Sequence, residues 1–188
     1  INCPHIENLQ LWKGANDEDK VIDIIFENNT IHYQYSTERQ IDGTRFYVGV
    51  RSLVFRDNDF HGSMSAGALI NDTSNEHNFI TNLIFANNDL TDLQRVNTDN
   101  TLVVIYGNNS RISDTSVYSI TDNDFSSAFH VLGFSGFNSN TGDLIIKMSN
   151  NTFLRDSLTF QMSTENVLDS ISLVMTNNIF NGELSPTR

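Results

Sequence analysis

The sequence predicts an all-β protein that folds as a right-handed, single-stranded parallel β-helix (a β-solenoid) of about six coils. Three observations predict this fold. A block of alternating apolar residues that ends in an Asn-Asn or Asp-Asn pair recurs every 27 to 35 residues. Proline occurs only at Pro4 and Pro186, so every residue between them can donate a backbone hydrogen bond to a sheet. No long stretch shows the apolar period of an amphipathic helix.

The repeated block aligns on its last asparagine, which we call the anchor. The six anchors are Asn29, Asn58, Asn88, Asn123, Asn151 and Asn178. In every block the residues five and three positions before the anchor, and two positions after it, are hydrophobic. Positions −5 and −3 share one face of a strand because side chains alternate with a period of two. Stacked coils should therefore place the anchors in an internal ladder, where each side-chain amide bonds its neighbours and the corner backbone.

The residue directly before each anchor, position −1, is always Asn or Asp. These residues tolerate the left-handed backbone of a sharp corner better than most others do. Ideal alternation would point position −1 inward, but Asp57 and Asp122 occupy it. An unpaired carboxylate in an apolar core costs several kcal/mol. We therefore expect the chain to bend before the anchor, so that position −1 points outward and the anchor points inward.

Further elements are predicted between the blocks. Second strands are expected at residues 45–50, 66–70, 102–106, 130–134 and 158–162. Exposed polar loops are expected at residues 35–42, 71–78, 108–115 and 137–143. Residues 6–13 are the best helical candidate and are expected to cap the N-terminal end. The predicted organisation is 1–20, an N-terminal cap or a linker from a longer chain; 21–182, the parallel β-helix; and 183–188, a C-terminal tail or continuation.

The composition limits the partners and the compartment. Eleven Lys and Arg against 23 Asp and Glu give a net charge of −12, which argues against a nucleic-acid partner. No apolar run is long enough for a membrane span in this segment. Cys3 is the only cysteine, so it either forms an intermolecular disulfide or remains a thiol. N-glycosylation sequons lie at Asn28, Asn71, Asn108 and Asn150, which fit a protein that is extracellular or on the cell surface.

At the block residues the chain resembles right-handed parallel β-helix proteins. The FxxN signature of the polymorphic outer-membrane protein repeats matches Phe26–Asn29, Phe55–Asn58 and Phe85–Asn88, and it relaxes to Ile or Met before the other anchors. The partner motif of that family, GGA followed by an aliphatic residue, is approached at 66–69. The NNxF corners also resemble those of pectate-lyase-like enzymes and phage tailspikes. The resemblance covers residues 21–182 and implies the fold, with surface adhesion, polysaccharide cleavage or receptor-glycan processing as the function.

No catalytic set recurs in the blocks, so no catalytic residue is predicted. Glycoside hydrolysis needs paired carboxylates across a groove, and the DND corners at 57–59 and 122–124 carry carboxylates. These corners are two coils apart, and Asx residues serve turns in general, so we interpret them as residues that close the corner. His32 and His61 should stack in adjacent coils, but no full ligand set accompanies them and no metal site is predicted.

The acidic stretch 16–20 suggests Ca²⁺ as the one conceivable cofactor. It lacks the glycine and the bidentate glutamate of a helix–loop–helix calcium site, so we interpret it as a solvated loop and predict no cofactor.

These observations favour a non-enzymatic extracellular or surface module, structural or adhesive, that is part of a longer or filament-forming glycoprotein. The expected partners are further copies or continuing segments of the same protein, because an open parallel edge needs a cover, and glycans. Two alternatives on the same scaffold stay open. One is a polysaccharide-degrading enzyme, either a lyase or a glycoside hydrolase. The other is a glycan-binding protein that resembles the phage tailspikes.

Overall fold

The computed structural model describes residues 2–3, 7–12, 21–33, 42–47, 49–64, 68–72, 80–90, 93–95, 103–107, 115–125, 130–134, 143–153, 160–162 and 170–180. Within these residues the chain forms strands and no helix. All strand pairs are parallel. The predicted all-β class is therefore confirmed for the described part of the chain, and no helix there could cross a membrane.

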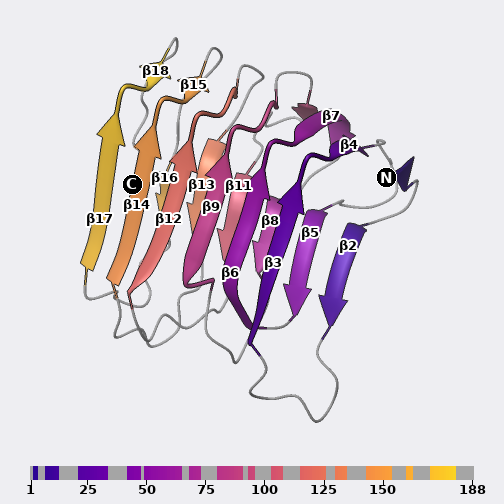
Figure 1. The fold of residues 1–188 in the computed structure, drawn as a ribbon, viewed down its shortest axis with the longest axis horizontal. Coiled ribbons are helices and arrows are strands. Elements are labelled where there is room, and N and C mark those ends of the chain that lie inside the picture. The colour runs from indigo at the N-terminus through magenta and orange to yellow at the C-terminus, as the bar shows by residue number, and fades with distance from the viewer. Residues whose placement is uncertain are drawn as a thin grey trace.

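The repeated blocks form a six-stranded sheet, which we call the block sheet (Figure 1). Its strands, in chain order, are β3 (Val21–Glu27), β6 (Gly49–Arg56), β9 (Asn82–Ala86), β12 (Ser116–Thr121), β14 (Asp143–Ser149) and β17 (Ser170–Thr176). Residues five positions before successive anchors are direct partners in the pairing, as in Leu53 with Leu83 and Tyr118 with Ile146. The block alignment thus gives the register of the sheet.

A second six-stranded sheet, the opposite sheet, lies behind the block sheet, and its strands run the other way in Figure 1. Its strands are β2 (Glu7–Trp12), β5 (Asp42–Tyr47), β8 (Ala68–Asp72), β11 (Val103–Gly107), β13 (His130–Phe134) and β16 (Phe160–Met162). Each of the five predicted second strands overlaps one of these strands. The prediction for 45–50 ran too far, because Gly49 and Val50 already belong to β6.

Two expectations about local structure are wrong. Residues 6–13 do not form a helix: Glu7–Trp12 is β2, which pairs in parallel with β5. Leu9 and Leu11 also fit a period of two, and in so short a segment the neighbouring strand decides. Asn71, expected to open a loop, lies in β8 and pairs with Tyr106 and Arg45. Because β1 and β2 precede residue 21, the parallel pairing extends into the segment expected to be a cap or linker, whereas residues 183–188 lie outside the described residues.

Short strands lie at the corner of the block sheet, and we call them the corner strands. All except β1 come after an anchor. One group of four contains β1 (Asn2–Cys3), β4 (Thr30–Tyr33), β7 (Asp59–Met64) and β10 (Leu93–Arg95). The other group pairs β15 (Thr152–Phe153) with β18 (Ile179–Phe180). Single parallel bridges from Asp59 through Asp89 and Asp124 to Thr152 connect the two groups.

The core is built from columns of equivalent block residues. Side chains at positions −5, −3 and +2 are buried in the middle blocks, as for Leu83, Phe85 and Leu90. The rings at position +2 stack almost parallel near the C-terminal end, with centroids 4.9 Å apart for Phe125 and Phe153. The next pair, Phe153 and Phe180, is 5.0 Å apart. Each buried Phe or Leu contributes about 1.5–3 kcal/mol, so these columns are a major source of stability.

Candidate functional site

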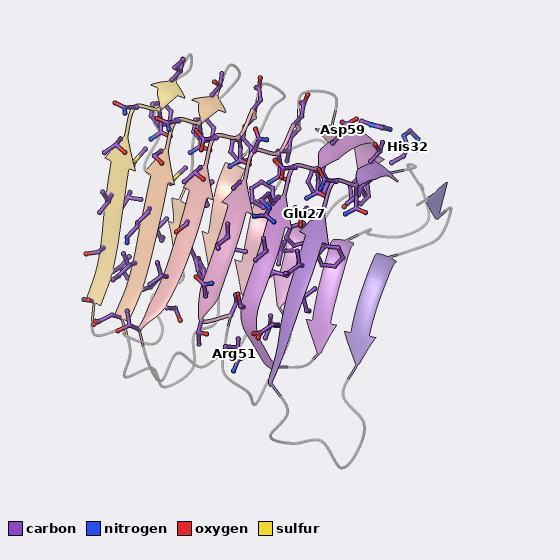
Figure 2. The ribbon with its side chains drawn as sticks, viewed as in Figure 1. Glu27, His32, Arg51 and Asp59 are labelled. Atoms are coloured by element: carbon purple, nitrogen blue, oxygen red, sulfur yellow. The ribbon has the colours of Figure 1, made fainter. Side chains whose placement is uncertain are left out.

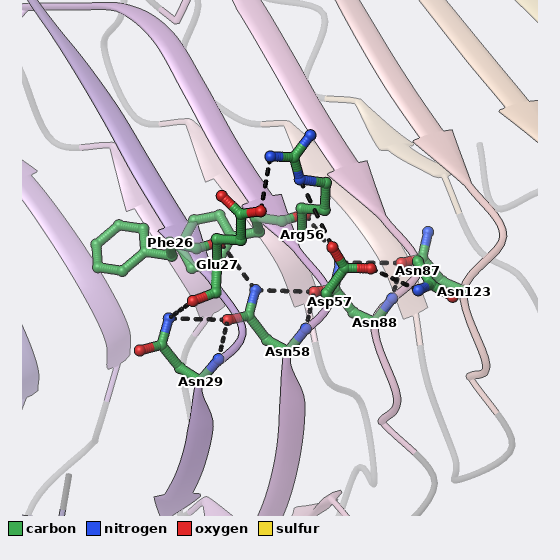
Figure 3. A network of polar contacts seen from close by, with 10 residues as sticks. Phe26, Glu27, Asn29, Arg56, Asp57, Asn58, Asn87, Asn88 and Asn123 are labelled. Atoms are coloured by element: carbon green, nitrogen blue, oxygen red, sulfur yellow. Dashed lines mark hydrogen bonds and ion pairs between the residues drawn. The ribbon is translucent and has the colours of Figure 1, made fainter.

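The anchors form a continuous hydrogen-bonded ladder along the inside of the corner. Figure 3 shows the part of it from Asn29 to Asn123. The backbone N–H of Asn58 and its side-chain Nδ2 both donate to Oδ1 of Asn88, at 3.1 and 3.0 Å. Asn88 donates in the same way to Asn123, at 2.9 and 3.0 Å. The same pair of bonds joins Asn29 to Asn58, Asn123 to Asn151, and Asn151 to Asn178. All six predicted ladder residues are therefore brought together.

The second hydrogen of each side-chain amide goes to a backbone carbonyl of the preceding block. Nδ2 of Asn88 donates to the carbonyl oxygen of Phe55 at 3.0 Å, and Nδ2 of Asn178 donates to that of Met148 at 2.9 Å. The first anchor differs: Nδ2 of Asn29 donates to the carbonyl of Glu27 in its own block. The bonds between anchors nevertheless have one direction, because each internal anchor donates to the next anchor along the chain and accepts from the one before it.

The column at position −1 faces outward, whereas the anchor column faces inward. Its six residues are the only non-glycine residues with positive φ in the described part of the chain, with φ between 51° and 58°. They are Asn28, Asp57, Asn87, Asp122, Asn150 and Asn177. Each side chain is exposed or half-buried. Where Asn follows Asp along the column, the amide donates to the carboxylate, as from Asn150 Nδ2 to Asp122 Oδ1 at 3.0 Å. Asn87 and Asp57 make the equivalent bond.

Charged side chains on the outer face of the block sheet pair with one another. Arg56 contacts Glu27 at 2.8 Å and Asp57 at 3.6 Å (Figure 3). The carboxylate of Glu27 raises the pKa of Arg56 through their hydrogen bond. Arg51 lies nearer the beginning of β6, well away from Glu27 in Figure 2. It makes a two-point contact with the carboxylate of Asp23. The hydrogen bond from this guanidinium lowers the pKa of Asp23 below its ordinary value.

The two histidines predicted to stack do lie side by side on β4 and β7. The ring centroids of His32 and His61 are 4.9 Å apart, and the rings are tilted by 58°. Nδ1 of His61 lies 3.4 Å from a carboxylate oxygen of Asp59, which is labelled beside His32 in Figure 2. Among the described residues, no group of three or more His, Cys, Asp or Glu side chains is arranged to hold a metal ion.

Aspartates also stack directly after the anchors, at position +1. Asp59, Asp89 and Asp124 are consecutive partners in the parallel bridges of the corner. Asp124 Oδ1 is buried and has no hydrogen-bond partner among the described atoms. The parallel bridges therefore place three carboxylate residues in one column.

The sequon residues are found in different environments. Asn28 and Asn150 lie at corners with exposed side chains. Asn71 lies within β8, and Asn108 lies outside the described residues. Cys3 lies in β1 at the N-terminal edge of the corner strands. The stretch 16–20, weighed for Ca²⁺, also lies outside the described residues.

The sequence analysis missed two features of the site. The ion pair of Arg56 with Glu27 could have been found, because both residues occupy position −2 of adjacent blocks. Gly62 gave little signal, because only one other block, at Gly182, has a glycine four residues after its anchor. Its φ is +97°, and a Cβ there would lie 2.1 Å from the carbonyl oxygen of Tyr33, so only glycine fits.

The fold and the ladder define an all-β protein of parallel sheets with an internal asparagine column. No protein-family model matches the chain, and no curated protein or solved structure is significantly similar to it.

Proposed function

We propose that the chain is a right-handed, single-stranded parallel β-helix of about six coils. The strand orders support this: each long sheet takes every successive turn of the chain in sequence order, without exchange of neighbours. The irregular loop lengths between anchors are compatible with it, because such connections lie outside the stacked columns. A crystal structure of the chain that showed left-handed crossings between the sheets would contradict the handedness.

We further propose that this solenoid is a non-enzymatic structural or adhesive module of an extracellular or surface glycoprotein, whose partners are further copies or segments of the same protein and glycans. The unbroken anchor ladder carries the proposal, because it uses the buried polar groups of the corner to build a stiff rod. The guanidinium groups of Arg51 and Arg56 pair with neighbouring carboxylates on the surface. Such pairs neutralise charge on the surface of the rod.

Glycosylation at the corners tests the extracellular part of the proposal. Asn28 and Asn150 are exposed, with a threonine two residues on, so a glycan there projects from the rod without disturbing the ladder. Expression in a eukaryotic secretory host should give a protein that is modified at these residues, measured by peptide mass spectrometry after enzymatic deglycosylation. Asn28→Gln and Asn150→Gln are the matched controls. A secreted chain with neither site occupied would contradict this part of the proposal.

The carbohydrate-active alternative rests on the column of Asp59, Asp89 and Asp124. Adjacent strands are about 4.8 Å apart and alternate strands about twice that, which spans the carboxylate separations of retaining and inverting glycosidases. We expect no release of reducing ends and no unsaturated uronate from soluble polysaccharides. Turnover by the full chain that Asp89→Asn abolishes, with the fold intact by circular dichroism, would favour the enzyme over the module.

A further inference from the structure

The anchor ladder ends differently at its two termini. The side-chain oxygen of Asn29 accepts no hydrogen bond from the described residues, whereas each later anchor oxygen accepts two from the anchor before it. At the other end, the backbone N–H of Asn178 has no acceptor among the described atoms, and its Nδ2 has only the carbonyl of Met148. One end of the ladder therefore offers donors and the other offers an acceptor. Two C-terminal ends brought together would oppose donor to donor.

The outer strands of the block sheet match this polarity. β3 and β17 are the two edges of that sheet, and each spans seven residues. Each strand ends two residues before its anchor. β17 of one copy can therefore pair with β3 of another copy with equivalent block positions opposite one another, as they are between β14 and β17. In this register Thr176 would face Glu27 and Ser172 would face Asp23. No like charges oppose one another across such a joint, since a hydroxyl meets each carboxylate.

Among the described residues, the pairing of the corner strands is compatible with the same joint. β1 pairs only with the second half of β4, through His32 and Tyr33. Thr30 and Ile31 have no strand partner on that side in the described part of the chain. Ile179 and Phe180 of β18 follow Asn178 as Thr30 and Ile31 follow Asn29. A docked β18 would therefore pair with Thr30 and Ile31, the two residues of β4 that come before those paired with β1.

Apolar exposure is concentrated at these two ends. Leu173 is 43% exposed, whereas its equivalent Leu83 in a middle block is fully buried. Val174 and Ile179 on the C-terminal block are 49% and 58% exposed, and Ile25 on β3 is 64% exposed. In the matched register Leu173 covers Ile24 and Val174 covers Ile25. Contact between the two ends would bury Leu173 as the middle blocks bury Leu83, and would remove part of the other exposed apolar surface from water.

We propose that copies of this chain stack head to tail, with β17 and β18 of one copy docked beside β3 and the first half of β4 of the next. Asn178 then donates to the side-chain oxygen of Asn29 in the next copy, and the Asn29 amide exchanges its bond with Glu27 for the carbonyl of Met175. The proposal rests on the solenoid proposed above and specifies how its copies associate. Such a heterologous contact does not close, so it generates a filament. Six coils per copy give an axial repeat of about 29 Å.

Lysines placed at each end test this arrangement with the full chain. Val174→Lys/Ile179→Lys blocks the C-terminal end, and Ile25→Lys/Thr30→Lys blocks the N-terminal end, all at exposed positions. Thr115→Lys/Ile84→Lys adds the same charge to a middle coil and is the matched control. Sedimentation velocity over a concentration series, with electron microscopy, should show filaments for the wild type and the control. Each blocked variant alone should remain monomeric, and an equimolar mixture of the two should form a dimer and no larger species.

Each outcome bears on the stacking separately from the solenoid. A wild-type chain that stays monomeric at all concentrations, with a cooperative β-sheet melting transition, would overturn the stacking and leave the solenoid module intact. Blocked variants that form filaments, or a mixture that stays monomeric, would also overturn it. A chain without a β-sheet spectrum would contradict the solenoid itself.

Discussion

The anchor column and the column beside it, at position −1, are built from almost the same residues and do opposite things. Asn87 and Asn88 are adjacent in sequence and chemically identical. Asn88 is buried and bonded to Asn58, Asn123 and Phe55, whereas Asn87 is exposed and bonds Asp57 at the surface. The difference arises from the backbone: position −1 adopts a left-handed φ, which turns two successive side chains to opposite sides of the corner.

This contrast teaches that asparagine serves two separate physical needs in one corner. At the anchor its side chain supplies two N–H donors and one carbonyl acceptor. All of them need hydrogen-bond partners because the position is buried. At position −1 it supplies tolerance of positive φ, for which its side-chain bonds are secondary. Four substitutions test the contrast, in order of decreasing expected effect.

The largest effect is expected from Asn88→Ala. The substitution leaves the amides of Asn58 without their acceptor and the carbonyl of Phe55 without its donor, all of them buried or half-buried. At about 1–3 kcal/mol for each unpaired group, the free energy of unfolding should fall by about 3 kcal/mol or more. Urea denaturation measures the loss. A midpoint equal to that of Asn87→Ala would contradict the distinction between the columns.

A smaller effect is expected from Asn87→Ala, because it removes no buried bond. Alanine in the left-handed region costs about 1 kcal/mol more than asparagine or glycine, so the loss of stability should be of that size. Asn87→Gly is the matched control and should retain the wild-type midpoint, since glycine adopts positive φ freely. Equal losses for the alanine and glycine variants would show that the side chain, and not φ, matters at this position.

The alternation of Asn and Asp along position −1 gives the third test. Asn150→Asp places a carboxylate directly beside that of Asp122 in place of the amide that bonds it. Facing like charges cost about 0.2–1 kcal/mol. The melting temperature should therefore fall at low ionic strength and recover in high salt, because salt screens exposed charges. Asn150→Ser, which adds no charge, should show no such dependence on salt.

The smallest effect is expected at the surface ion pair of Asp23 and Arg51. The guanidinium lowers the pKa of Asp23 from 3.8, so the pair stabilises the fold above that pH. This contribution is lost as the pH falls through the lowered pKa. Arg51→Ala should raise the pKa of Asp23 toward 3.8, measured by NMR titration of the carboxyl carbon, with a slight loss of stability at neutral pH only. An unchanged pKa would contradict the pairing, and Arg51→Lys serves as the control.

Much of the site follows from the repeat alone. Equivalent residues of successive blocks stack, so the alignment specifies the ladder, the phenylalanine stack and the His32–His61 contact. The outward turn of position −1 follows as well, since the two aspartates in that column could not be buried unpaired. The sequence determined these columns because a period that recurs in six blocks overrides the ambiguity of any one of them.

Only the tertiary structure decided the features that lie outside the repeat. Glu7–Trp12 is a strand because β5 lies beside it, and nothing local to the segment distinguishes strand from helix. Arg51 reaches Asp23 because the register of β3 and β6 shifts there, which leaves Arg51 as the unpaired residue of a bulge. Gly62 is required by the approach of the Tyr33 carbonyl from the adjacent strand. In each case the deciding contact comes from a neighbouring strand about 30 residues away in the sequence. Over that distance loop closure and packing, and not local preference, set the geometry.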